Sequence, residues 1–148
     1  MAEYSDKFVD TGLKGEIQHV IHDGVYLISP IVCNNEVLGI HNKSVLPYMS
    51  LNSNKFTGEA HQMFIIKYNK KDDYFTLMPL NSFLYLGVEK KQDSNYNASE
   101  VVQYSESDDH LSNWQIYLDD HFSIRLKGTN YYFEYNKNKW LEILLKGK

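Results

Sequence analysis

Two acid–histidine clusters, SDDH at 107–110 and LDDH at 118–121, hold the side chains of this sequence that are best suited to chemistry. Carboxylates and imidazoles ligate divalent cations, so these clusters are the first candidates for a metal site. Adjacent carboxylates at a corner between strands more often form turns, however. Another histidine pair, His19 and His22, is three residues apart, and on a strand such side chains face opposite sides of the sheet. We therefore expect no metal site.

The sequence also lacks the short motifs that carry catalysis. It contains no G-x-S-x-G, no H-E-x-x-H and no phosphate-binding loop. The single cysteine, Cys33, excludes an internal disulfide and a C-x-x-C zinc pair, and a small apolar packing role fits it better than nucleophilic chemistry. We expect a protein that is not an enzyme, with no catalytic residue and no cofactor.

Tyrosine is the residue type that stands out in the composition, with 12 copies alongside many asparagines. Its ring offers a flat apolar face, while its hydroxyl can stay hydrated. A surface rich in tyrosine and asparagine suits polar ligands, including sugars. Tyrosine is also favoured in strands, so the composition indicates such a ligand without establishing it.

Length and charge limit the class of protein. A chain of 148 residues suits a single domain, 1–148, with one sizeable core. The formal charge of −4 argues against a nucleic-acid-binding surface, which is normally basic. No run of apolar residues is long enough to span a membrane. The N-terminus lacks the pattern of a secretory signal, so we expect a cytoplasmic protein or one released by a non-classical route.

Short apolar and aromatic runs, separated by polar turns, recur along the whole chain. Helical periodicity is nearly absent, and these runs are rich in β-branched and aromatic residues, which predicts strands. No linker rich in proline, glycine or serine divides the chain. The pattern predicts a single all-β domain, either a sandwich or a barrel.

The strand pattern repeats three times, with a period of about fifty residues. The first strands of the units are 25–29, 74–78 and 122–126, and the second strands are 36–40, 84–88 and 132–135. The third strands are 48–51, 100–104 and 140–145, and fourth strands follow at 63–68 and 114–118. We place the units at about 22–71, 72–120 and 121–148. No fourth strand is found in the third unit. We expect the N-terminal strand, 15–21, to take that place and close the ring.

Three units of four strands, each leading into a Q-x-W-like strand, resemble the β-trefoil fold and, within it, the ricin-type lectin family. Gln62-Met63-Phe64 fits the Q-x-W element with Phe for Trp, whereas Ser112-Asn113-Trp114 keeps the Trp but loses the Gln. In size and composition the chain is similar to small haemagglutinin components of clostridial toxin complexes. The resemblance implies that Phe64 and Trp114 point to the threefold axis and pack in the core.

The resemblance also implies a sugar site inside one unit, built from an acid after the first strand, an aromatic platform and amides. In the first unit Asn34 or Asn35 replaces the acid, Tyr48 is the platform, and Asn42 and Gln62 add contacts. The candidates in the other units are Asn81, Tyr96 and Asn113, with Asp93 the nearest acid, and then Asn130 and Tyr135. The family's acid after the first strand is missing from all three units. An ordinary interpretation also stands: these asparagines form turns and these tyrosines build strands.

The leading hypothesis is a non-catalytic carbohydrate-binding module whose partners are glycans, with galactose-type sugars the first choice. The alternative is a module whose loops bind partner protein chains, either as a subunit of a toxin complex or as a protease inhibitor. Its long polar loops are CNNE, NSNKFTGEA and KKQDSNYNASE. A third possibility is a different closed barrel that holds a small apolar ligand inside.

Overall fold

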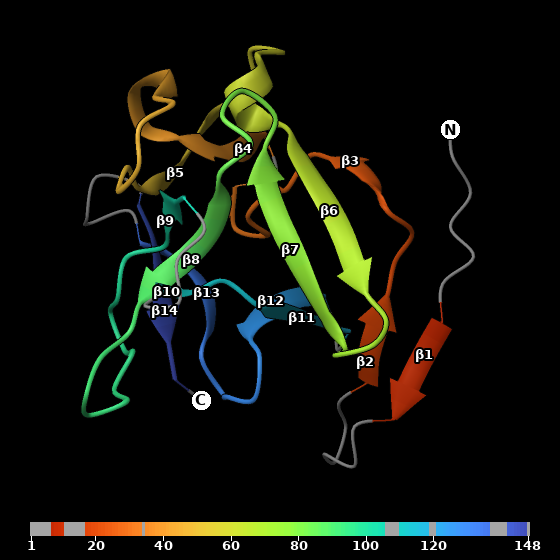
Figure 1. Cartoon of the computed structure of the whole chain (residues 1–148). Coiled ribbons are helices and arrows are strands. Elements are labelled where there is room, and N and C mark those ends of the chain that lie inside the picture. The colour runs from red at the N-terminus through yellow and green to blue at the C-terminus, as the bar shows by residue number, and fades with distance from the viewer. Residues whose placement is uncertain are drawn as a thin grey trace.

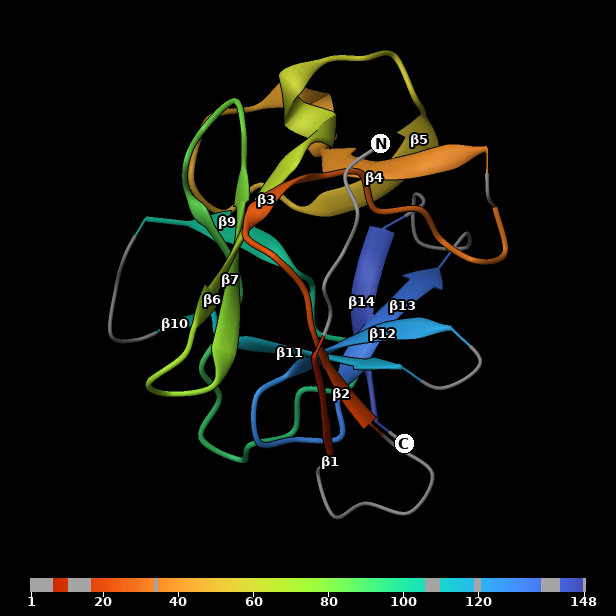
Figure 2. The same cartoon turned by 90° about the vertical axis from the view of Figure 1, so that its right-hand side faces the viewer.

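The computed structural model describes residues 7–10, 17–33, 35–105, 110–118, 121–136 and 142–147, and nearly all of its regular structure is strand (Figures 1 and 2). The strands are β1 (Lys7–Asp10), β2 (Ile17–Val20), β3 (Gly24–Tyr26), β4 (Glu36–Ile40), β5 (Leu51–Lys55), β6 (Phe64–Asn69), β7 (Tyr74–Pro79), β8 (Tyr85–Glu89), β9 (Val102–Tyr104), β10 (His110–Leu111), β11 (Trp114–Leu118), β12 (Phe122–Leu126), β13 (Tyr132–Asn136) and β14 (Glu142–Lys146). Two short 3₁₀ helices, η1 (His41–Lys43) and η2 (Ala60–Gln62), lie in the described part of the chain. No helix among the described residues is long and apolar enough to cross a membrane.

Alternating burial explains why the strands pair as they do. In the hairpin of β6 and β7, Phe64 and Ile66 on one strand and Phe75 and Leu77 on the other are buried, while the residues between them are more exposed. A period of two places these four side chains on one face of the sheet. The strands pair in antiparallel register, with Ile66 opposite Leu77 (Figure 1). The same sheet continues from β3 through β6, β7 and β11 to β12.

Three backbone bridges join the third strands of the units in a ring. The segments that contain β5, β9 and β14 meet pairwise, and each pair shares one bridge. The bridged residues are Ser50 with Val102, Glu100 with Leu144, and Asn52 with Glu142. Each third strand also pairs with a second strand, giving the pairs β4–β5, β8–β9 and β13–β14 (Figure 1). The threefold arrangement predicted from the repeats is therefore confirmed.

The repeated aromatic residues lie in the core, as predicted. The side chains of Phe64 and Trp114 are fully buried at the start of β6 and β11. The indole Nε1 of Trp114 donates to the carbonyl oxygen of Leu86 at 2.9 Å. Its ring meets that of Phe133 edge-on, with 4.9 Å between centroids. Trp114 thus ties the second unit to the third and still satisfies its one polar group.

Glycine at the second strand allows the chain to cross closely above it. A Cβ atom on Gly87 would lie 2.6 Å from the backbone oxygen of Leu111, and one on Gly39 would lie 3.0 Å from the Cγ atom of Gln62. Both crossing segments lead into a fourth strand. The corresponding residue of the third unit is Glu134, which forms an ion pair with Lys146 at 3.2 Å. The glycine therefore belongs to the units in which a fourth strand follows.

We expect Gly87→Ala to lower the free energy of unfolding by about 1–3 kcal/mol, because the new methyl group meets rigid backbone. Gly39→Ala should cost less, because its closest contact, the Gln62 Cγ atom at 3.0 Å, is longer than the 2.6 Å contact at Gly87. Urea unfolding followed by tryptophan fluorescence measures both. Equal losses in the two variants would contradict the proposed role of the Leu111 backbone.

The N-terminal strand does not pair where the sequence predicted. Strand β2 pairs with β1 and with the end of β11, where Gln18 lies opposite Tyr117 and Ile17 opposite Leu118. Within the described residues, β12 pairs instead with β11 and β13. The reason lies in the edge of β11 that β7 shares, since β7 pairs with this edge only at Trp114, opposite Phe75. The rest of that edge is open to β2. The predicted corner at Asp119 and Asp120 lies outside the described residues.

Candidate functional site

The predicted first-unit residues are divided by strand β4. Asn35 precedes β4, whereas Asn42 follows it in η1, and both side chains are exposed. A strand of five residues spans roughly 16 Å, so one sugar ring cannot contact both. Tyr48 lies on the same connection as Asn42, just before β5. The structure therefore brings Asn42 and Tyr48 onto one connection and separates Asn35 from them. Asn34 lies outside the described residues.

The connection from β4 to β5 holds its residues in unusual backbone conformations. Asn42, Lys43 and Tyr48 have φ angles of 56°, 55° and 70°. Asparagine tolerates this left-handed region, but for lysine and tyrosine it costs free energy. Hydrogen bonds keep the loop in place: the Ser44 amide donates to the His41 oxygen at 3.2 Å, and the Leu46 amide donates to Ser44 Oγ at 3.0 Å. The loop is thus strained but well ordered by its own contacts.

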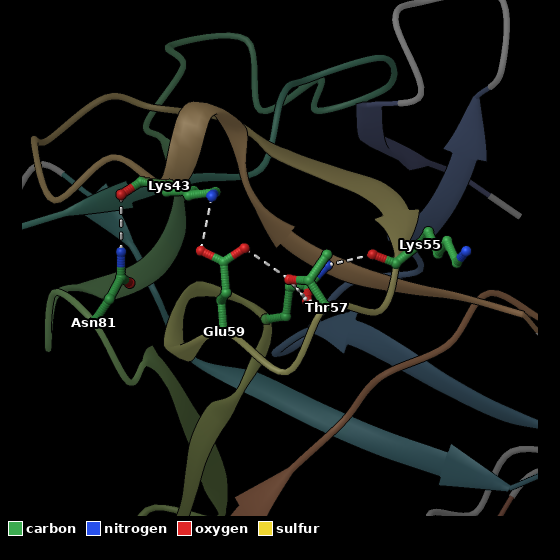
Figure 3. A network of polar contacts seen from close by, with 6 residues as sticks. Lys43, Lys55, Thr57, Glu59 and Asn81 are labelled. Carbon is green, nitrogen blue, oxygen red and sulfur yellow. Dashed lines mark hydrogen bonds and ion pairs between the residues drawn. The ribbon is translucent and has the colours of Figure 1, made fainter.

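A network of polar contacts fixes the side of this connection near Asn42 (Figure 3). Lys43 Nζ lies 2.8 Å from Glu59 Oε2, and the Lys43 carbonyl oxygen accepts a hydrogen bond from Asn81 Nδ2 at 3.1 Å. Thr57 Oγ1 donates to the other Glu59 oxygen at 2.9 Å. The hydrogen bond from Lys43 is the main cause that lowers the pKa of Glu59, with Thr57 next. Glu59 is therefore an ionised acceptor at the surface, paired with Lys43, the residue that follows Asn42.

Gln62 lies beneath this network rather than on the surface. Its side chain is only 2% exposed. The Oε1 atom accepts from the Thr57 amide at 2.8 Å and from Thr57 Oγ1 at 2.9 Å, and Nε2 donates to the Lys55 oxygen at 2.8 Å. Burial lowers the pKa of the neighbouring His61, which keeps that imidazole neutral. The amide of Gln62 thus orders the loop that carries Glu59 and does not face solvent.

Tyr48 presents its ring at the junction of the first and second units. The side chain is 67% exposed. Its ring packs against Tyr104 in a T-shaped arrangement, with 5.0 Å between centroids and 85° between planes. Burial raises the pKa of Tyr104 to about 12, so that phenol stays neutral under Tyr48. The backbone amide of Tyr48 donates to the Gln103 oxygen at 2.7 Å. Tyr48 is an aromatic platform with a fixed base.

Sequence reasoning missed Gln103, which joins two units. Its side chain is completely buried in β9. Nε2 donates to the carbonyl oxygens of Ser44 at 2.9 Å and Leu46 at 2.8 Å, while Oε1 accepts from Ser82 Oγ at 2.8 Å. One amide therefore holds the Tyr48 connection of the first unit against a loop of the second. The available signal was a glutamine inside the apolar run VVQY.

Glu36 was also missed, although it stands beside the predicted Asn35. Glu36 Oε1 accepts from the buried hydroxyl of Ser53 at 2.8 Å. The pKa of Tyr135, a third-unit candidate, is raised by desolvation, then by a hydrogen bond with Cys33 and by the charge of Glu36. A carboxylate therefore does follow the first strand of the first unit, but at the end of β4 that is far from Tyr48.

The other candidates divide between buried and surface positions. Tyr96 is only 5% exposed, and its ring packs edge-on against Tyr131 with 5.7 Å between centroids. The prediction that Tyr96 serves as an aromatic platform for a ligand is wrong, because its side chain is buried. Asp93 Oδ1 accepts from the Asn95 amide at 3.0 Å and so forms a turn. Asn113 and Asn130 are exposed. Within the described residues, no three histidine, cysteine or acidic side chains gather as a metal site would require.

No protein-family model and no curated protein matches the sequence. Solved structures do match. The agglutinin of Rhizoctonia solani superposes with a TM-score of 0.73 at 16% identity, covering 87% of this chain and 89% of that one. The Macrolepiota procera ricin B-like lectin, in complex with lactose, gives 0.70 at 18%, covering 87% and 89%. The chain has the β-trefoil fold of the ricin B-like lectins. A mosquitocidal holotoxin also matches, with a TM-score of 0.71 at 18% identity, covering 87% of this β-trefoil and 16% of the toxin chain.

Proposed function

We propose that this β-trefoil is a non-catalytic carbohydrate-binding module, with its site on the connection between β4 and β5. The observation that carries the proposal is Tyr48, an aromatic ring that stays largely exposed on a strained and firmly held backbone. Strain of this kind persists only where surrounding contacts hold it, and it is common at binding sites. The fold shared with an agglutinin and with a ricin B-like lectin in complex with lactose supports the same class of function.

The chemistry of the site suits a pyranose ring. The apolar face of a sugar stacks on Tyr48, and the Asn42 amide both donates to and accepts from hydroxyl groups. Glu59 adds a charged acceptor, which forms stronger hydrogen bonds than a neutral one. Gln62 supports the site from below by ordering the Glu59 loop. Asn35 contacts only a longer glycan that runs along β4.

Galactose-type sugars are the first ligands to test. The Macrolepiota lectin, whose structure contains lactose, supports that choice. A single exposed aromatic platform gives weak binding, so avidity must come from several sites or from assembly with partner chains.

We expect Tyr48→Ala to weaken binding to lactose at least about tenfold, since the stacking surface is lost. Its stability should change little, because the ring is at the surface. Phe122→Ala, which removes another exposed aromatic side chain, is the matched control and should bind like the parent protein. Titration calorimetry measures both. A glycan panel without any signal would overturn the proposed function, whereas full binding by Tyr48→Ala would move the site elsewhere.

A protein-binding role is the second candidate, and one feature favours it. Ile31 and Val32 are strongly exposed on the connection between β3 and β4. Exposed aliphatic side chains at a loop tip suit contact with another protein. The holotoxin match shows the fold as a small part of a longer toxin chain. A protease panel tests the inhibitor version. Co-purification of Ile31→Asp with partner chains, compared with the parent protein, tests the toxin-subunit version.

A further inference from the structure

Four exposed apolar side chains lie where the first and second units meet. They come from the connection between β4 and β5 and from the connection between β7 and β8. We call them the seam patch: Val45 at 56% exposure, Leu46 at 64%, Tyr48 at 67% and Phe83 at 59%. Monomeric soluble proteins rarely group such residues without a use for them.

Hydrogen bonds hold the two connections of the seam patch together. Asn81 Nδ2 donates to the carbonyl oxygens of Lys43 at 3.1 Å and Ser44 at 3.3 Å. The buried amide of Gln103 bonds both connections, through the Leu46 oxygen on one side and the Ser82 hydroxyl on the other. Phe83 itself has a φ angle of 57°, an uncommon value for an aromatic residue. The patch is therefore prearranged on fixed backbone.

The junction of the second and third units provides an internal comparison. There the backbone amide of Ala98 donates to the Leu145 oxygen at 2.7 Å, just as the amide of Tyr48 donates to the Gln103 oxygen at 2.7 Å. The φ angles of the two donor residues are also similar, 64° for Ala98 and 70° for Tyr48. The match makes Ala98 the counterpart of Tyr48.

Two further counterparts follow from the same alignment. Tyr96 is the counterpart of Leu46, two residues earlier on each connection, and it is buried. The backbone amides of Leu84 and Tyr131 each donate to a hydroxyl oxygen two residues back, Ser82 Oγ at 3.2 Å and Thr129 Oγ1 at 3.0 Å. Asn130 is therefore the counterpart of Phe83. The second junction thus has alanine, a buried tyrosine and asparagine. The fold does not require the exposed apolar set.

Polar residues precede the apolar residues of the seam patch along the connection from β4. Along the connection from β4 the order is Asn42, then Lys43 paired with Glu59, then the apolar Val45 and Leu46. Tyr48 has both an apolar ring and a polar hydroxyl, so it suits either the polar or the apolar part of a ligand. A ligand that complements this surface has a polar ring at one end and an apolar group at the other, without charge on the apolar part.

We infer that the seam patch binds the apolar aglycone of an amphiphilic glycoside, of the glycolipid class, whose sugar lies over Tyr48 and Asn42. The inference rests on the proposed function and names the ligand class of the same site. Burial of an alkyl chain against Val45, Leu46 and Phe83 removes apolar surface from water and adds to the binding of the sugar.

The test compares methyl β-galactoside with octyl β-galactoside, below the micelle concentration, by titration calorimetry. We expect the octyl glycoside to bind the parent protein about tenfold more tightly. Phe83→Asn, which installs the residue of the second junction, should remove that advantage and leave methyl glycoside binding unchanged. Asparagine tolerates the φ angle of this position, so the variant should fold normally. Phe122→Asn, at an exposed aromatic residue outside the patch, should keep the advantage.

The outcomes separate the two proposals. If both glycosides bind the parent protein equally, or if Phe83→Asn keeps the octyl advantage, the inference is wrong and the sugar-binding function stands. If octyl glycoside and octanol bind alike while methyl glycoside does not bind, the patch binds apolar groups and the sugar-binding function is wrong. Failure of every glycoside to bind overturns both.

Discussion

Trp114→Ala is expected to lower the free energy of unfolding by about 3–5 kcal/mol, the cost of removing a large aromatic side chain from a packed core. The ring is fully buried, packs edge-on against Phe133 and lies where two units meet. Its loss leaves a cavity and also removes the donor to the Leu86 oxygen. Urea unfolding must be followed by circular dichroism in this case, because the substitution removes a tryptophan.

A graded pair of variants tests this role for Trp114. Trp114→Phe introduces the residue that the first unit has at the same place, Phe64, and should cost clearly less than the alanine. Phe122→Ala, at an exposed aromatic residue on β12, should change stability by less than about 0.5 kcal/mol. A Trp114→Ala protein as stable as Phe122→Ala would mean that the aromatic core is not what joins the units.

The threefold fold could be predicted because each unit repeats the same packing solution in its sequence. Phe64 and Trp114 recur at one place, and Gly39 and Gly87 at another, and the structure explains both by close contacts in the core and at the crossings. Such residues are fixed by sterics, which act locally and leave a pattern. The repeat period followed directly from them.

The pairing of the N-terminal strand could not be predicted in the same way. Both β11 and β12 offer short edges to a four-residue strand, and the choice depends on how far β7 extends along β11. That extent is a matter of tertiary register, which a repeat pattern does not contain.

The candidate site was predictable in part, and its limits have a physical cause. Tyr48 and Tyr96 look alike in the sequence, each next to a turn, yet one is exposed and the other is buried. The backbone hydrogen bonds of the two loops show that Tyr48 corresponds to Ala98, two residues after Tyr96. In the sequence, nothing sets Glu36 apart from the asparagines beside it. Only the partner strand, with Ser53, reveals its position.

Gln103→Leu is expected to weaken sugar binding and stability together, although Gln103 touches no ligand in the proposed site. Leu145 is at the matching place of the second junction, so we expect the core to accommodate a leucine side chain at position 103. The change removes both donors to the Ser44 and Leu46 oxygens and the acceptor for Ser82. Leaving buried polar groups without partners should cost about 2–3 kcal/mol in unfolding free energy.

Binding to lactose should fall about tenfold in Gln103→Leu, because the connection that carries Tyr48 is then free to leave its strained conformation. Gln115→Leu is the matched control. Its amide makes two long hydrogen bonds, donating to the Asp73 oxygen and accepting from the Tyr117 hydroxyl, each at 3.3 Å, and neither involves the connection that carries Tyr48, so binding should be unchanged. Combining Gln103→Leu with Tyr48→Ala should add little to the loss from Tyr48→Ala alone, since both act through one connection. Full lactose binding by Gln103→Leu would show that the conformation of this connection does not matter for the site. Additive losses in the double variant would place the effect of Gln103 on another surface.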